Sequence, residues 1–157
     1  MEGSIQIQLN FLKRLYGVLF ASLIIMLLFA SIMVSNYGSL LTPNEALFAT
    51  LKSIAIAVGA IFLVVAYLYP QRLIRKIDSN LTLAEKIAMY RKPIGLRLIL
   101  VTDAGIVSSI VFLLTADTNL MLVLTIILIF FILARPTPFK IAADLNLSEE
   151  EKNFLLH

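Results

Sequence analysis

The sequence predicts an all-α integral membrane protein: a four-helix bundle of two antiparallel transmembrane hairpins, with short amphipathic helices on the cytoplasmic side. Composition, four long apolar runs and the placement of basic residues predict this fold. Hydrophobic residues make up 60% of the 157 residues, charged residues make up 15%, and the mean hydropathy is +0.94. Soluble domains carry about 25% charged residues. We therefore expect one membrane domain over residues 1–157 and no second core.

The four apolar runs are the predicted membrane spans. They cover residues 15–34, 46–69, 96–114 and 120–135. A helix needs about 20 apolar residues to cross about 30 Å of hydrocarbon, and the fourth run is short by this measure. The first run exceeds the roughly 7–15 apolar residues of a cleaved signal peptide, so we expect it to be retained. A central loop, residues 70–95, and a tail, residues 136–157, complete the chain.

Basic residues predict the orientation. Twelve of the thirteen Lys and Arg residues precede the first run, surround the central loop or follow the fourth run, and only Lys52 falls on the other side. Short cytoplasmic loops are enriched in Lys and Arg, so the N-terminus, central loop and C-terminus are expected in the cytoplasm, with the chain in a bacterial inner membrane. Five basic residues are expected to attract anionic lipid head groups: Arg72, Arg75, Lys76, Arg91 and Lys92. Membrane lipids are thus expected partners, and nucleic acid is not.

Three capping patterns predict helix starts. Residues 42–45, Thr-Pro-Asn-Glu, place a capping Thr and a Pro at the first helical position before the second run. Residues 82–85 form a capping box that should open a short cytoplasmic helix ending near Pro93, where the third span begins. Residues 148–151 repeat the box in the tail. The three glutamates of that segment oppose the basic central loop in charge, so tail and loop are expected to dock.

Small residues at helical spacing predict close contacts between spans. Helices in lipid associate where small side chains let their backbones approach. The candidates are Gly17 and Ala21, then Ser53, Ala57 and Ala60, then Thr102, Gly105 and Ser109. The fourth run has no such stripe, so it is expected to face lipid or a partner.

The two cytoplasmic segments resemble each other, which leaves two interpretations open. Sliding the chain by 64 residues matches the segment from Lys76 to Glu85 with the segment from Lys140 to Glu149, and a slide of 66 residues competes with it. One interpretation is duplication of a helical hairpin. The other is that hairpins ending in the cytoplasm have the same physical needs.

Asp103 is the residue that packing does not explain. It lies seven residues inside the third run, where a charge costs at least about 2.5 kcal/mol. Arg97 lies about 120° around the helix, and Lys52 is about 10 Å away in depth, so a direct bridge to either would be stretched. A water-filled crevice, a hydroxyl such as that of Thr102, a cation from another subunit and protonation remain open.

Residues for catalysis or metal binding are lacking. The chain has no cysteine, and its one histidine, His157, is terminal. No cluster of histidines or convergent acids appears, so we expect neither an enzyme nor a cofactor or metal site.

The second half of the chain resembles uncharacterised small four-span bacterial inner-membrane proteins. The resemblance rests on Tyr90-Arg91, Arg97 and Asp103-Ala104-Gly105 within residues 86–105, on Arg-Pro-Thr at 135–137, and on Asp-Leu-Asn-Leu at 144–147. It implies four spans and an inner-membrane location, and it brings no activity with it.

Two functional hypotheses follow. The first is a non-catalytic assembly protein, either an accessory subunit of a larger membrane complex or a homo-oligomer, as the short loops and apolar fourth run suggest. The second is a small ion channel or proton-coupled transporter in which Asp103 titrates with Lys52, Arg97 and Thr102 as neighbours. The partners would be other membrane subunits in the first case, or further copies of this chain in either case.

Overall fold

The computed structural model describes residues 2–78 and 80–156, and each regular element within them is an α-helix, so the predicted all-α class is confirmed. His157 lies outside the described residues. The helices are α1 (Glu2–Tyr37), α2 (Glu45–Ile74), α3 (Leu83–Thr115), α4 (Asn119–Leu133), α5 (Pro138–Asp144) and α6 (Glu149–Leu156). Three of them, α1 to α3, are long and apolar enough to cross a membrane. The pair α4 and α5 would be a fourth span only if counted together, and it is bent by 80°.

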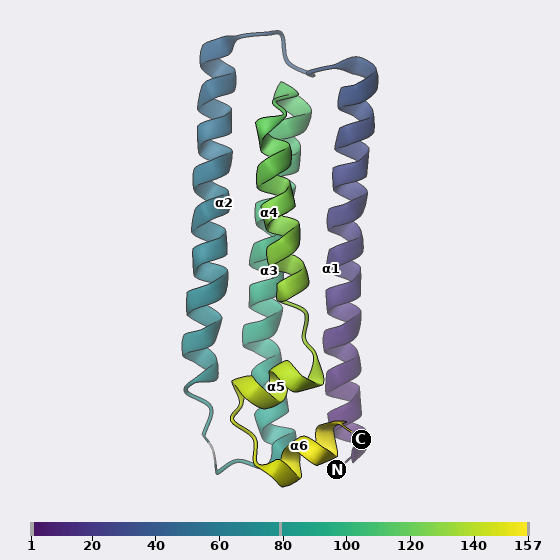
Figure 1. Ribbon diagram of the computed structural model, residues 1–157, viewed down its shortest axis with the longest axis vertical. Helices are drawn as coiled ribbons and strands as arrows, with labels where there is room; N and C mark the ends of the chain where they lie inside the picture. Colours follow the sequence, from purple (N-terminus) through teal and green to yellow (C-terminus); the bar gives the residue numbers. More distant parts are fainter. Residues whose placement is uncertain (1, 79, 157) are drawn as a thin grey trace.

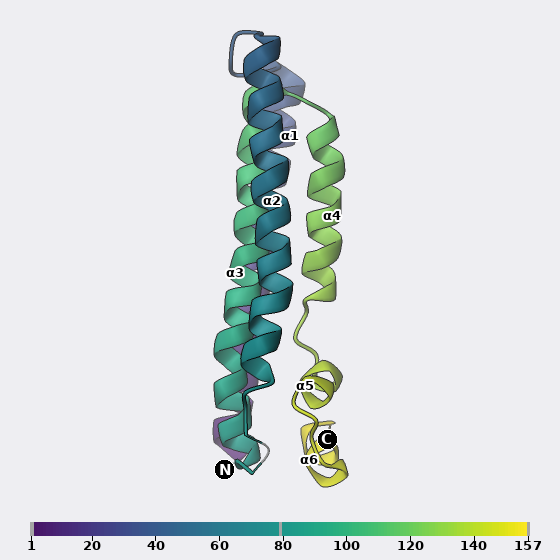
Figure 2. The ribbon, with the colours of Figure 1, turned by 90° about the vertical axis from the view of Figure 1, so that its left-hand side faces the viewer.

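Helix α3 is the centre of the structure. Its contacts with α2, α1 and α4 dominate the packing between helices. Helices α1 and α2 flank α3, and α4 lies across one face of this three-helix layer (Figures 1 and 2). The predicted pairing into two hairpins is not what organises the packing, because α1 and α2 are not among the main helix pairs. The two halves also differ in length, since α2 has 30 residues and α4 has 15.

Small residues bring the flanking helices close to α3. The predicted stripe on α3 is buried as expected: Thr102, Gly105 and Ser109. A Cβ atom at Gly105 would collide with the end of the Leu23 side chain on α1, so any larger residue here requires that side chain to move. The small residues predicted in the first two spans are instead exposed, and that prediction was wrong: Gly17, Ala21, Ser53, Ala57 and Ala60. On α2 the buried small residues are Ala55, Gly59 and Ala66, which belong to a different face of the same helix.

Several helix boundaries differ from the prediction. Helix α3 starts at the predicted capping box, where the Thr82 N–H donates to Glu85 Oε2 at 3.0 Å. It then continues through Pro93, so the predicted short helix and third span are one helix. The loop between α2 and α3 is shorter than the predicted central loop, because α2 likewise continues through a proline, Pro70. Both prolines are buried among neighbouring helices, where packing offsets one missing backbone hydrogen bond.

The first two helices also begin elsewhere than predicted. Helix α1 begins at Glu2, well before the apolar run. The cap of α2 is Asn44, whose Oδ1 accepts from the Leu47 N–H at 3.1 Å, and not Thr42. Asn caps at least as well as Thr, and Pro43 then stays outside the helix.

The fourth apolar run ends early. Helix α4 has 15 residues, which is about 22 Å, against about 30 Å of hydrocarbon. After a short break the chain forms α5, a helix that was not predicted, with Thr137 as its cap and Pro138 at its start. Helix α6 follows at the predicted capping box, in which the Ser148 N–H donates to Glu151 Oε2 at 3.0 Å.

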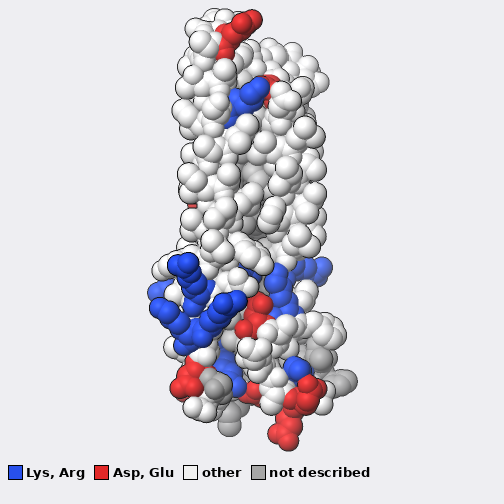
Figure 3. All heavy atoms as spheres, turned by 60° about the vertical axis from the view of Figure 1, so that its left-hand side comes forward, with Lys and Arg blue, Asp and Glu red and all other residues white. Residues whose placement is uncertain are grey.

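Charge is segregated along the long axis. Lys and Arg gather at one end of the visible face, and a broad band in which only a trace of acid shows, at its left edge, separates them from a small charged group at the other end (Figure 3). We call the first end the basic end; it is formed by the end of α2, the start of α3, α5 and α6, and both termini lie there (Figure 1). We call the other end the opposite end; it carries the loops at 38–44 and 116–118.

Candidate functional site

Two charged residues of α3, Arg97 and Asp103, lie within its apolar run. Counting about 1.5 Å per residue from the end of α3 at Thr115, Asp103 lies about 18 Å from the opposite end and Arg97 about 27 Å from it. On a hydrocarbon layer of about 30 Å, Asp103 is near the middle and Arg97 near the boundary at the basic end. The two side chains also leave the helix about 120° apart, so they belong to different faces.

Asp103 lies on the face of α3 that no other helix covers. Its side chain is partly exposed, and it makes no hydrogen bond or ion pair with any residue that the structure describes. Ile99 and Ile110 share its face and are 44% and 42% exposed. Figure 2 shows α4 on the other side of the three-helix layer. We call this surface, formed by Ile99, Asp103, Ile106 and Ile110, the uncovered face.

The four predicted site residues do not converge. Lys52 pairs with Asp117 at 2.7 Å at the opposite end, so it is no partner for Asp103. The Thr102 hydroxyl is buried and donates to the Leu98 carbonyl of its own helix at 2.8 Å. Asp117 was not among the predicted residues, although its place in the short link between the third and fourth runs put it at the same end as Lys52.

Arg97 is buried on the covered face. It is only 7% exposed, its Nε–H donates to the Ala66 carbonyl at 3.3 Å, and it forms no ion pair within residues 2–78 and 80–156. The guanidinium faces a cavity of about 110 Å³ lined by residues of α2, α3, the end of α4 and α5. Because α4 ends early, this part of α3 is left open. We call this cavity the notch.

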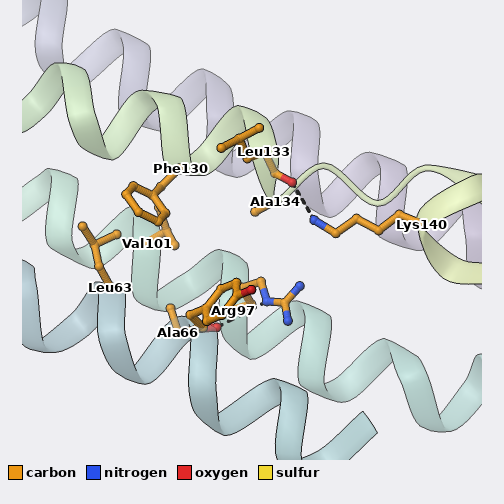
Figure 4. Close-up of a pocket in the computed structure, with 9 residues that line it drawn as sticks. Leu63, Ala66, Arg97, Val101, Phe130, Leu133, Ala134 and Lys140 are labelled. Atoms are coloured by element: carbon orange, nitrogen blue, oxygen red, sulfur yellow. Dashed lines mark hydrogen bonds between the residues drawn. The ribbon is translucent and has the colours of Figure 1, made fainter. Parts of the chain in front are cut away.

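Lys140 is the second cation of the notch. It reaches back from α5, and its Nζ donates to the Leu133 carbonyl at the end of α4 at 2.6 Å (Figure 4). The apolar walls include Leu63, Val101 and Phe130. Lys140 was not among the site residues predicted from the sequence. The signal that could have located it is the Thr137-Pro138 pair, a helix cap followed by Pro, which turns the chain back under α4.

At the basic end, α5 and α6 are held against α3 by two polar contacts. The Tyr90 hydroxyl donates to Asp144 Oδ2 at 2.7 Å, and Lys86 Nζ donates to Glu151 Oε1 at 2.8 Å. The second contact confirms the predicted docking of the tail glutamates for Glu151. The Lys86 ammonium holds the pKa of Glu151 below its usual range.

The five residues expected to attract lipid head groups are exposed: Arg72, Arg75, Lys76, Arg91 and Lys92. Arg91 has a second role, because it also holds the start of α1. Its Nη1 donates to Gln8 Oε1 at 2.9 Å, and its guanidinium lies 4.6 Å from the centre of the Phe11 ring.

Within the described part of the chain, no group of three or more His, Cys, Asp or Glu residues is placed to hold a metal ion. Compared with protein-family models, with curated proteins and with solved structures, the chain matches none.

Proposed function

We propose that this chain is a non-catalytic, four-span membrane protein that associates with other membrane helices through its uncovered face. It acts as an accessory or assembly subunit of a larger complex, or as a homo-oligomer. It sits in a bacterial inner membrane with the basic end, and therefore both termini, in the cytoplasm, as the preference of Lys and Arg for that side supports. Helix α4, with its bent continuation α5, completes the fourth crossing of the bundle.

The position of Asp103 is the observation that carries this proposal. A carboxylate near the middle of the hydrocarbon layer needs a cation, a hydrogen-bond donor or a proton. Among the described residues, Asp103 has neither a cation nor a hydrogen-bond donor as partner. It lies on a face of α3 that no described helix covers. A partner helix that presents a cation or a hydroxyl at this depth would satisfy the carboxylate and cover the flanking isoleucines.

Photocrosslinking from a single cysteine tests the proposal. The chain has no cysteine, so Ile110→Cys places one thiol on the uncovered face, where a photoactivatable maleimide can be attached. Ile126→Cys on α4 is the matched control, because Ile126 is 50% exposed and lies at a similar distance from the opposite end. In native membranes we expect one discrete product from Ile110→Cys, its loss when Asp103→Asn is added, and no discrete product from Ile126→Cys. A product of twice the 17.5 kDa chain mass identifies a homo-oligomer, and another mass identifies a partner subunit.

Equal crosslinking from both positions, or crosslinking that survives Asp103→Asn, would overturn the assembly role. The second hypothesis, a channel or proton-coupled transporter, predicts something different. Proton flux into liposomes that contain the purified chain would then be present and would disappear with Asp103→Asn. The assembly proposal predicts no such flux from the purified chain.

A further inference from the structure

We propose that the notch binds the phosphate of an anionic phospholipid, with one acyl chain of that lipid lying in the groove between α2 and α4. This inference needs the chain to sit in a membrane but does not need the uncovered face, so the two proposals can fail separately. It is also distinct from the general attraction of exposed basic residues to head groups, because the notch is a cavity with a buried cation.

The donors of the notch suit a phosphate. Arg97 carries five N–H donors, and within the described residues only its Nε–H has a hydrogen-bond partner. The planar guanidinium fork matches phosphate oxygens in two parallel hydrogen bonds. Lys140 gives one ammonium proton to the Leu133 carbonyl and keeps two. That bond also offsets the partial negative charge at the end of α4, which would otherwise disfavour an anion.

The depth of the notch agrees with a head-group phosphate. Arg97 lies about 27 Å from the opposite end of α3, close to the boundary of a hydrocarbon layer of about 30 Å. Phosphates of the inner leaflet lie just beyond that boundary. Asp144, an acid on α5 that would repel an anion, is bonded to Tyr90 and does not line the cavity.

An apolar groove between α2 and α4 adjoins the notch. It holds about 340 Å³ and is lined by Leu63, Val64, Tyr67, Leu68 and Phe130, three of which also line the notch. Both take their α2 residues from the same stretch, residues 63–68, so the groove lies beside the notch at a similar depth. A cationic pocket beside an apolar groove offers one surface to the head group of a lipid and another to its acyl chain. In Figure 4, Arg97 and Lys140 extend toward the opening from different helices. Leu63 and Phe130 lie on the side of the opening away from α5.

Fluorescence quenching tests the inference directly. The chain has no tryptophan, so Phe130→Trp places a single reporter where the notch and the groove meet. The purified chain is reconstituted in vesicles that contain phosphatidylglycerol or phosphatidylcholine with brominated acyl chains, which quench nearby indoles. One basic residue near the membrane surface favours anionic lipid by a factor of about five. We therefore expect half-quenching by phosphatidylglycerol at a mole fraction at least about fivefold lower than by phosphatidylcholine. Ile126→Trp, exposed on the same helix outside the groove, should show no preference.

Charge variants test whether Lys140 in the notch causes the preference for phosphatidylglycerol. In the Phe130→Trp background, Lys140→Gln should reduce the preference by about fivefold, whereas Lys92→Gln should leave it unchanged. Lys140→Gln carries this test because loss of the buried Arg97 could disturb folding. Asp103→Asn should also leave the preference intact, which separates this inference from the proposed assembly role.

Two results would overturn the inference. One is equal quenching by the two lipids at Phe130→Trp, or a preference that Lys140→Gln leaves undiminished. The other is a rise in melting temperature caused by inorganic phosphate alone, without a lipid preference, because the notch would then take a free anion.

Discussion

The two faces of α3 deal with charge in different ways. On the covered face, Lys86 pairs with Glu151, Tyr90 bonds to Asp144, and Arg97 bonds to a carbonyl of α2 beside the notch. On the uncovered face, Asp103 has no partner among the described residues. Both faces belong to one continuous helix, so local sequence does not explain the difference. The covered face is completed by α4, α5 and α6 in turn, whereas no described helix completes the other face.

This difference indicates which parts of the surface the fold uses for itself. Polar groups that have partners within the chain stabilise the arrangement of the helices. A carboxylate left without a partner near the middle of the apolar band does not, and a group of this kind in a membrane marks a functional surface by default. Changes on the two faces should therefore have different consequences, and four predictions measure them.

The largest effect is expected from overpacking the covered side. Gly105→Leu must displace Leu23, because even a Cβ atom at this position collides with that side chain. Overpacking of this kind costs about 1–3 kcal/mol. At roughly 2–4 °C per kcal/mol for a chain of this length, the melting temperature of the purified protein should fall by about 5 °C. Ile110→Leu on the uncovered face is the control and should change it little. An unchanged midpoint in Gly105→Leu would show that α1 does not approach α3 so closely.

The second largest effect is expected to be a gain in stability, from a change on the uncovered face. Asp103→Leu removes a carboxyl group that has no partner among the described residues, so the isolated protein should unfold at the same or a higher temperature. We expect a gain of about 1 kcal/mol, less than the 2.5 kcal/mol or more for a charge buried at the bilayer centre, because this side chain is partly exposed. Thermal unfolding in detergent measures it, with Asp103→Asn as the conservative comparison. A clear loss of stability in both variants would mean that Asp103 has a partner inside its own chain.

These contrasts also show how far the sequence alone reaches. The all-α class and the capping boxes at Thr82 and Ser148 were predictable because hydropathy and capping depend on residues close together in the chain. Pro93 misled the prediction for the same reason: it breaks isolated helices, but in α3 it is buried by neighbours that the sequence does not reveal.

The candidate sites were predictable only in part. Asp103 could be singled out because one acid in an apolar run is visible in any sequence. Its orientation was not predictable, since α3 is apolar on nearly all sides within its run and no polar face shows which way it points. The notch was not predictable either, because it depends on the 80° bend between α4 and α5 that brings Lys140 back beneath α4.

A smaller effect is expected where α6 completes the covered face. Lys86 is 8% exposed and Glu151 23% exposed, so their pair should contribute up to about 1 kcal/mol to docking of the tail. The pair holds the pKa of Glu151 below its usual range. A carboxyl with a depressed pKa stabilises the folded state above its unfolded pKa of about 4.3, and the contribution is lost as the pH falls through the folded value. Amide exchange of α6, corrected for intrinsic rates, should therefore quicken below about pH 4. Lys86→Met should quicken it already at pH 7, and the exposed Lys92→Met should not.

The smallest effect is expected at Lys52, the one basic residue at the opposite end. Lys52 pairs with Asp117 of the same chain, just as Lys86 on the covered face pairs with Glu151. Both side chains of the Lys52 pair are partly exposed, at 32% and 20%. Exposed pairs contribute below about 1 kcal/mol and weaken in salt. Lys52→Met should lower the unfolding free energy by about 0.5 kcal/mol at low ionic strength and by less in high salt. Asp117→Asn should give a similar value, and the double variant should cost no more than either single change. A double variant that costs the sum of both would show that the two side chains act independently. The pairing of charges within the chain would then be confined to the covered face, where Lys86 pairs with Glu151.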